Sequence, residues 1–336
     1  MKNRKYFICI TALFIAVMGL SACSNYLDTA DNYGSIYINL GSAGERFAVT
    51  EKDTNNIKYA ITLTSKGQED IKKTISNATG QIKIEVPVGI WTVKIDAEGL
   101  KPSRIAKGHG EKSNIEVKAE ELTPVEISMK TTATRVYTWE ELCSDLANTE
   151  ELPYPDLEYI EIANDLVASK TAESRATRVE AVLKAEDNIT ITRGDSLKDS
   201  LFNVFNILIL EGNITLDGDK ENFGKDNASA LINVEIGGHL RIWDGVTLYN
   251  NKSFEGGGVN VKGGRFTMYG GKISGNTAER GGGVFVSSGA SFIKNGGTVF
   301  GSGAEDLSNK ANVAGHAVYI NGIAVNETLL PENKWP

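Results

Sequence analysis

The sequence Gly-Gly-Gly-Val-Asn-Val at residues 256–261 returns as Gly-Gly-Gly-Val-Phe-Val at residues 281–286, an offset of 25 in the numbering. Further along, Phe266 returns as Phe292 at an offset of 26, so one residue is inserted in the turn between the two motifs. Short apolar segments that end at Gly or Asn and recur at this period are typical of a solenoid. In such a fold each coil stacks on the previous one.

The repeat extends beyond these two copies. The preceding segment aligns by the same step of 26, so that Leu240 matches Phe266 and Ile242 matches Met268. Degenerate copies fall at residues 159–162, 188–191, 207–216 and 317–320. We therefore expect about seven coils. Helical repeats are excluded because Gly triplets do not fit the interior of a helix.

Residues one repeat apart should stack, because neighbouring coils of such a solenoid lie about 4.8 Å apart. Val259 is expected to pack inward on Val284. Asn250 and Asn276 are expected to form a side-chain ladder between coils. The fold class is therefore expected to be all-β, with a parallel β-helix over residues 153–336.

The motifs at residues 271–278 and 281–286 resemble those of the pectin-lyase-like right-handed β-helices. Within that group they are most similar to the Gly-rich repeats of bacterial polymorphic outer-membrane proteins and related surface lipoproteins. The likeness covers residues 230–325 by motif and residues 155–229 by pattern. It implies a right-handed parallel β-helix, and it implies no single activity, because this fold carries lyases, hydrolases, adhesins and passive stalks.

The N-terminal part contains short segments with alternating apolar and polar residues, at 35–40, 59–63, 81–86, 91–95 and 125–129. Period-two alternation predicts strands with one buried face. Over residues 34–130 they predict a β-sandwich. The hairpin at residues 80–99 resembles the carboxypeptidase-regulatory-like and prealbumin-like sandwiches of bacterial surface proteins, which implies a spacer or stalk.

Residues 131–152 are expected to be a linker followed by a capping helix. Lys130 to Arg135 is polar and predicts a short link between two independently folding domains. Thr138 and Glu141 then form a capping box, which predicts a helix from about residue 138 to 148. Its apolar stripe includes Cys143 and should cover the open end of the first coil.

The segment 1–22 predicts a signal peptide, with cations at Lys2, Arg4 and Lys5 before an apolar stretch. Cys23 follows Leu-Ser-Ala, a pattern similar to the bacterial lipobox, which implies lipidation of Cys23 and a lipidated tether over residues 23–33. The expected location is the outer membrane or cell surface, with the lipid as the contact to the membrane.

Charge argues against nucleic acid as a partner. The chain has 35 Lys and Arg against 43 Asp and Glu, and removing three cations with the signal peptide leaves 32 against 43, a net charge of −11. An acidic protein repels phosphate backbones.

The best-formed coils lack the residues that enzymatic chemistry requires. A glycoside hydrolase needs two carboxylates, and a lyase needs Ca²⁺ ligands and a base, yet Glu279 is the only acid between Gly256 and Gly301. No catalytic residue or cofactor is therefore assigned. We expect a non-enzymatic adhesin-like protein, with a polysaccharide lyase or glycoside hydrolase as the alternative.

One acidic loop is a weak Ca²⁺ candidate. Asp217, Asp219 and Asp226 lie close together in the sequence, but they lack the spacing of an EF-hand loop. A solvated polar turn is the simpler interpretation, so no metal is assigned.

A candidate ligand platform comes from strand alternation. If Leu240 and Ile242 point inward, Arg241 and Trp243 point outward, and Tyr269 lies one coil step from Trp243. Exposed paired aromatics beside an arginine suit a glycan or a surface-protein ligand. The alternative is that Trp243 folds under the loop that contains Phe223.

Overall fold

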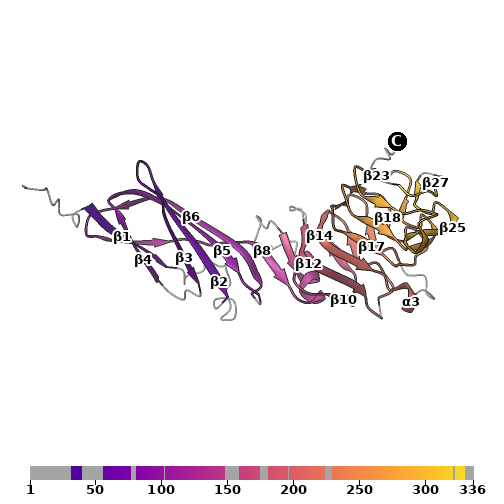
Figure 1. Cartoon of the computed structure of the whole chain (residues 1–336), viewed down its shortest axis with the longest axis horizontal. Helices are drawn as coiled ribbons and strands as arrows, with labels where there is room; N and C mark the ends of the chain where they lie inside the picture. The colour runs from indigo at the N-terminus through magenta and orange to yellow at the C-terminus, as the bar shows by residue number, and fades with distance from the viewer. Residues whose placement is uncertain are drawn as a thin grey trace, which may run out of the picture.

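The computed structural model describes residues 32–39, 56–76, 81–101, 103–147, 159–174, 181–195, 197–223, 229–320 and 322–329. The chain is mostly β, and it contains a β-solenoid of about five turns over residues ~133–299. Figure 1 shows the N-terminal strands at one end of an elongated molecule and the solenoid at the other.

The N-terminal strands form two sheets around one core. In the first sheet, β1 (Tyr33–Asn39) pairs antiparallel with β4 (Gln81–Pro87) and parallel with β7 (Leu122–Glu126). The second is antiparallel and has the order β3 (Ile71–Ser76), β2 (Ile57–Ser65), β5 (Gly89–Gly99) and β6 (Ile105–Val117). Both contribute buried residues to one cluster, among them Ile36 and Trp91. Alternation places these side chains on the inner faces.

Strand β8 (Lys130–Val136) joins the two ends of the molecule. It pairs antiparallel with β6 and parallel with β9 (Tyr159–Ile162), so one sheet runs from the N-terminal strands into the solenoid. The short polar link expected at residues 130–135 is therefore part of a strand. Its polar residues misled the sequence interpretation because Arg135 is buried against a partner on β9.

That partner is Glu161, which lies opposite Arg135 in the register. The guanidinium donates two hydrogen bonds to the carboxylate, Nε to Oε1 at 2.9 Å and Nη2 to Oε2 at 3.0 Å. It also donates to the carbonyl oxygens of Gly99 and Ser103, at 3.0 and 3.2 Å. A buried charge pair needs such saturation, because each ion has lost its water. The pair therefore fixes β5, β8 and β9 together.

Helix α2 (Trp139–Ala147) follows β8 directly, close to the predicted boundaries. Its capping box is formed, since Glu141 N donates to Thr138 Oγ1 at 3.2 Å and Thr138 N donates to Glu141 Oε2 at 3.3 Å. Trp139, Leu142 and the other stripe residues are buried in the solenoid core.

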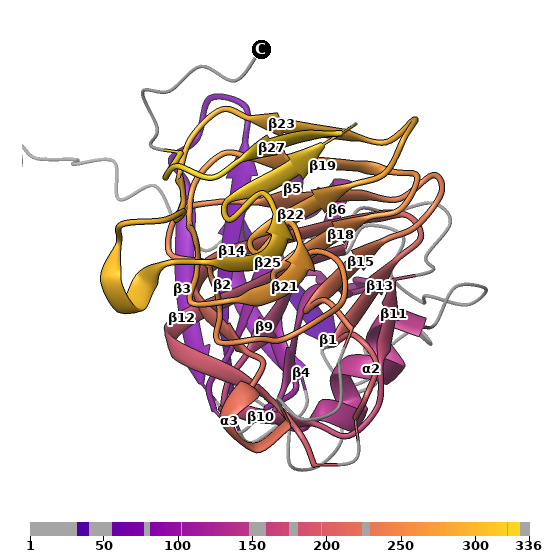
Figure 2. The same cartoon turned by 90° about the vertical axis from the view of Figure 1, so that its right-hand side faces the viewer.

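Each turn of the solenoid has three strand positions, and equivalent strands stack in parallel (Figure 2). The first row is β9, β12 (Ala181–Arg193), β14 (Ile207–Asp217), β16 (His239–Ile242), β19 (Arg265–Met268) and β23 (Ser291–Lys294). The second is β10 (Leu166–Ala168), the later halves of β12 and β14, β17 (Thr247–Tyr249), β20 (Lys272–Ser274) and β24 (Thr298–Val299). The third is β11 (Ala172–Ser174), β13 (Phe202–Val204), β15 (Ile232–Val234), β18 (Val259–Val261), β22 (Val284–Val286) and β26 (Val318–Ile320).

Shorter elements lie between these rows. They are α3 (Lys220–Phe223), β21 (Thr277–Arg280), which pairs with β25 (Lys310–Ala314), a 3₁₀ turn at Glu305–Leu307, and β27 (Ile323–Val325).

The predicted inward stacks are present. Leu240, Phe266 and Phe292 share one register position on β16, β19 and β23, and all three are buried. The rings of Phe266 and Phe292 stack with centroids 4.8 Å apart. Val259 likewise lies against Val284.

The expected count of about seven coils is too high. The last copy, at residues 317–320, belongs to β26, which stacks on β22 but then turns back to pair antiparallel with β27. Leu329 also pairs with Val299 and is buried in the core. The chain thus covers the last turn instead of starting another.

The asparagine ladder runs through Asn251, Asn276 and Asn309, and not through Asn250. Asn276 Oδ1 accepts from Asn251 N at 3.0 Å, and Asn309 Oδ1 accepts from Asn276 N at 2.9 Å. All three residues are fully buried. Asn250 instead has a φ of 58° and donates to Asp217 Oδ1. Asn251 and Asn276 differ by 25 in the numbering, so the alignment by 26 selected the neighbouring asparagine.

Arg193 lies at the N-terminal end of this ladder. Its Nη2 donates to Asn251 Oδ1 at 3.3 Å, and Nη1 donates to the carbonyl oxygens of Leu197 and Asp199. Burial lowers the pKa of this guanidinium to about 10. The arginine therefore satisfies backbone carbonyls where the ladder has no further asparagine.

The ladder predicts a large effect of Asn276→Ala. The substitution removes two donated bonds, to Leu248 O and Asn309 Oδ1, and leaves Asn251 N without its acceptor. We expect a loss of about 3 kcal/mol in the free energy of unfolding, measured in urea. Asn295→Ala is the control, since Asn295 is exposed, and should change it by less than about 0.5 kcal/mol. Equal effects would contradict a structural ladder.

The buried Arg135–Glu161 pair lies where β8 connects the N-terminal strands with the solenoid, a place here called the joint. The pair predicts that single and double substitutions have unequal effects. Glu161→Ala leaves Arg135 charged and unpaired, so it should cost about 3–5 kcal/mol in the free energy of unfolding. Replacing both residues, as in Arg135→Met with Glu161→Leu, should cost much less, because no buried charge remains. In the unaltered chain Arg135 should also resist trypsin. Early cleavage after Arg135 would contradict the buried joint.

Candidate functional site

Arg241, Trp243 and Tyr269 lie on the outer face of the first row of strands. Arg241 is on β16, between Ile209 and Thr267 in the register, and Trp243 and Tyr269 directly follow β16 and β19. The two rings stack with centroids 4.4 Å apart and an interplanar angle of 15°. Trp243 is 43% exposed and Tyr269 38% exposed.

Trp243 is therefore not folded under another segment. If Trp243 packed beneath the loop after β14, its side chain would be buried, but it is 43% exposed. Turn geometry explains why it stays outside: the backbone turns at Asp244 and Gly245 immediately after it, and Gly245 has a φ of 89°. The side chain remains on the strand surface.

The stack determines which surface a ligand meets. Each ring packs one face against the other, so the ring edges and the two outer faces remain for a ligand. Aromatic edges carry positive potential and faces carry negative potential. The pair therefore suits a ligand that offers acceptor oxygens as well as apolar surface.

A shallow cavity of about 360 Å³ adjoins the aromatic pair. It is lined by residues of the turn after it and by the start of the second row, Asp244, Gly245, Val246, Thr247, Gly271, Lys272, Gly297 and Thr298. Gly245, Gly271 and Gly297 have φ values of 89°, 80° and 71°, and a Cβ at any of them would lie within 2.6 Å of a backbone oxygen. A side chain at any of these three turns would collide with the backbone of the preceding coil, so all three positions require glycine.

The register also places an acidic residue, Glu211, beside this surface. Leu210 lies opposite Ile242, so the following residues, Glu211 and Trp243, are neighbours. The Glu211 carboxylate pairs with Lys184 at 3.6 Å. Both side chains are more than a third exposed, so the pair contributes little to stability, but it offsets the negative charge beside Trp243.

Of the weak Ca²⁺ candidate, Asp217 and Asp219 lie among the described residues, and both accept hydrogen bonds within their own turn. Asp217 Oδ1 accepts bonds from Asp219 N and Asn250 Nδ2, at 2.8 and 2.9 Å, and Asp219 Oδ2 accepts from Asn222 Nδ2 at 2.7 Å. These bonds stabilise a polar turn. Asp226 lies outside the described residues. Within the described residues, no group of three His, Cys, Asp or Glu side chains could hold a metal ion.

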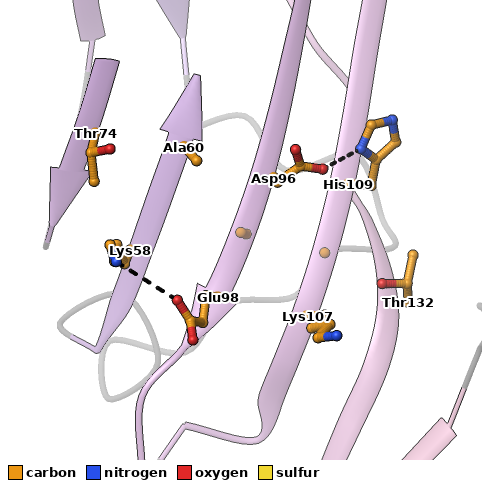
Figure 3. Close-up of a pocket in the computed structure, with 10 residues that line it drawn as sticks. Lys58, Ala60, Thr74, Asp96, Glu98, Lys107, His109 and Thr132 are labelled. Atoms are coloured by element: carbon orange, nitrogen blue, oxygen red, sulfur yellow. Dashed lines mark hydrogen bonds and ion pairs between the residues drawn. The ribbon is translucent and has the colours of Figure 1, made fainter. Parts of the chain in front are cut away.

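A second cavity, of about 510 Å³, lies on the N-terminal sheet (Figure 3). Its walls include Asp96, whose Oδ1 lies 2.7 Å from His109 Nδ1, and Glu98, which pairs with Lys58 at 3.9 Å. Ala60 and Gly108 leave the sheet surface low between these side chains. Sequence reasoning missed the His109 contact because its partner is thirteen residues away on the next strand. The pairs are solvent-exposed, as expected for a charged ladder across strands.

Two side chains with nucleophilic or acidic chemistry are already engaged in the fold. Cys143 is buried, and burial raises the pKa of its thiol to about 11, so it is protonated at neutral pH. Glu279 Oε1 accepts a bond from Asn312 Nδ2 at 2.8 Å. The lipidation candidate, Cys23, lies outside the described residues.

No helix in the described part of the chain is long and apolar enough to cross a membrane. Comparison with protein-family models, with curated proteins and with solved structures finds no match to this chain.

The exposure of Trp243 can be measured by fluorescence. Trp91 and Trp139 are 1% and 2% exposed and should not respond to iodide. In a Trp335→Phe background, we expect a red-shifted component that iodide quenches, and this component should vanish on Trp243→Phe. If the component lost on Trp243→Phe is blue-shifted and iodide does not quench it, Trp243 is buried.

Proposed function

We propose that this protein is a non-enzymatic binding protein of the cell surface. In this proposal a lipid on Cys23 anchors the chain at the outer membrane, the N-terminal strands act as a sandwich-like stalk, and the solenoid presents the ligand-binding surface. The finer description of the solenoid as a right-handed β-helix with α2 as its cap is part of the same proposal. The burial of the α2 stripe in the solenoid core supports it.

The observation that carries the proposal is the exposed Trp243–Tyr269 pair. Large aromatic side chains are seldom left exposed on a strand surface without a partner. Trp, Tyr and Arg are the residues most enriched among those that dominate binding energy. Here a Trp and a Tyr stack beside Arg241 and an open cavity, on a rigid sheet that holds them in fixed positions before a ligand arrives.

The joint supports the stalk role. Arg104 Nη2, from the loop after β5, donates to Asp145 Oδ2 of α2 at 2.9 Å, and Lys101 Nζ lies 3.1 Å from Asp187 of β12. With the buried Arg135–Glu161 pair, these contacts hold the solenoid in one orientation on the N-terminal strands. A binding surface is presented best on a support that does not bend at its attachment.

A polysaccharide lyase or glycoside hydrolase is the alternative. It requires a base or paired carboxylates beside the bound polymer. The acids near the aromatic pair are Asp244, in the turn, and Glu211, which already pairs with Lys184. Release of unsaturated or reducing ends from an acidic polysaccharide, lost on Asp244→Ala, would favour this alternative.

Binding of residues 24–336 to a glycan array and to purified surface proteins tests the proposal. For any ligand found, Trp243→Ala should weaken binding by about 2 kcal/mol, or roughly thirtyfold, because truncation removes the larger ring of the pair. Ile236→Ala is the matched control, since Ile236 is 84% exposed on a solenoid turn outside the pair. A ligand that binds both variants with unchanged affinity would place the binding surface elsewhere.

A further inference from the structure

The end of the N-terminal strands that lies farthest from the solenoid carries exposed apolar side chains. Four residues, here called the apolar tip, are Tyr33, Val88, Ile90 and Leu122, which are 47%, 40%, 63% and 55% exposed. They lie where β1 begins, where β4 turns into β5, and where β7 begins. Figure 1 shows β1 at the end of the molecule opposite the solenoid.

Backbone pairing holds the apolar tip together. Tyr33 lies opposite Pro87 in the register, and Val88 N donates to Asn32 O at 2.8 Å. On the other side of β1, Glu120 N donates to Tyr33 O at 2.9 Å, and Leu122 lies opposite Ser35. The exposed side chains are therefore carried by hydrogen-bonded strand ends, so their exposure does not result from a loose loop.

The distribution of exposed apolar residues is uneven. Among the described residues before β8, five large apolar side chains are exposed, and four of them form the apolar tip. The fifth, Leu100, lies beside the joint, at the opposite end of the N-terminal strands. Scattered exposed apolar residues need no explanation, but a group at one extremity does. The group needs a partner that reaches this end of the molecule.

The chain that precedes the apolar tip indicates the partner. Nine residues separate Cys23 from Tyr33, and nine residues can span at most about 30 Å. If Cys23 carries a lipid, as in the proposed function on which this inference rests, the apolar tip stays within that distance of the bilayer. Weak apolar contacts then act at high effective concentration.

We propose that the apolar tip docks on the lipid surface that holds the anchor. Tyr33 suits the interface because its ring is apolar and its hydroxyl is polar. Three acids beside the tip, Glu116, Glu120 and Glu121, are exposed and outnumber the one cation there, Lys118. These charges remain among headgroups or in water. Docking is therefore favoured by zwitterionic lipid and weakened by anionic lipid. The molecule then stands on the membrane by its strand ends, with the solenoid pointing away from the bilayer.

The test uses the full lipidated protein in phosphatidylcholine vesicles, with an environment-sensitive fluorophore on Lys118→Cys. Lys118 is exposed next to the apolar tip and is not part of it. Cys143 is buried and should not be labelled. We expect blue-shifted emission and quenching by brominated lipid. A fluorophore on Lys310→Cys of the solenoid should show neither effect.

A double substitution in the apolar tip, Ile90→Ser with Leu122→Ser, distinguishes docking of the tip from anchoring by the lipid. Both residues are exposed, so the fold should persist, and flotation with vesicles should be unchanged while quenching at residue 118 is lost. If the protein with an unaltered tip floats with the vesicles but brominated lipid does not quench the fluorophore at residue 118, the docking proposal is overturned and the lipid anchor is not. Failure of the lipidated fraction to float would overturn both.

Discussion

Coil-to-coil stacking in a single register is the constraint on which the structure depends. A single coil has no inner layer of its own, so its apolar side chains are buried only by the coils above and below. Leu240, Phe266 and Phe292 show this, each covering the next at one strand spacing. The ladder through Asn276 fixes the same register with hydrogen bonds, and a slip by one residue would expose the apolar stack and break the ladder together.

The sequence predicts the solenoid well because one sequence repeat corresponds to one coil, so residues that match in the repeat also stack in the structure. It predicts the neighbourhood of Trp243 and Tyr269 for the same reason, since alternation and the coil step are enough to place them. It cannot predict the orientation of their rings, which depends on packing. It also misplaces the ladder at Asn250, because turns vary by one residue, and it misinterprets β8, because Arg135 is polar in sequence and neutralised only by Glu161, which lies far along the chain.

The joint changes how the two ends of the molecule act together. Two separate apolar clusters, one in the N-terminal strands and one in the solenoid, would suit two parts joined by a flexible link. Strand β8 instead continues one sheet between them, and Arg135, Arg104 and Lys101 add ionic contacts across it. A surface such as the Trp243–Tyr269 pair is then held at a fixed distance and direction from the N-terminal end, which a flexible link would not achieve.

Hydrogen exchange of the backbone amides of β8 and β9 tests this continuity most directly. If the sheet passes through the joint, the amides of residues 130–136 that pair with β6 and β9 should be protected as strongly as those of β5. Their exchange should accelerate on Glu161→Ala. Exchange of residues 130–136 at the rate of an unstructured segment, with β5 and β12 protected on either side, would contradict a continuous sheet.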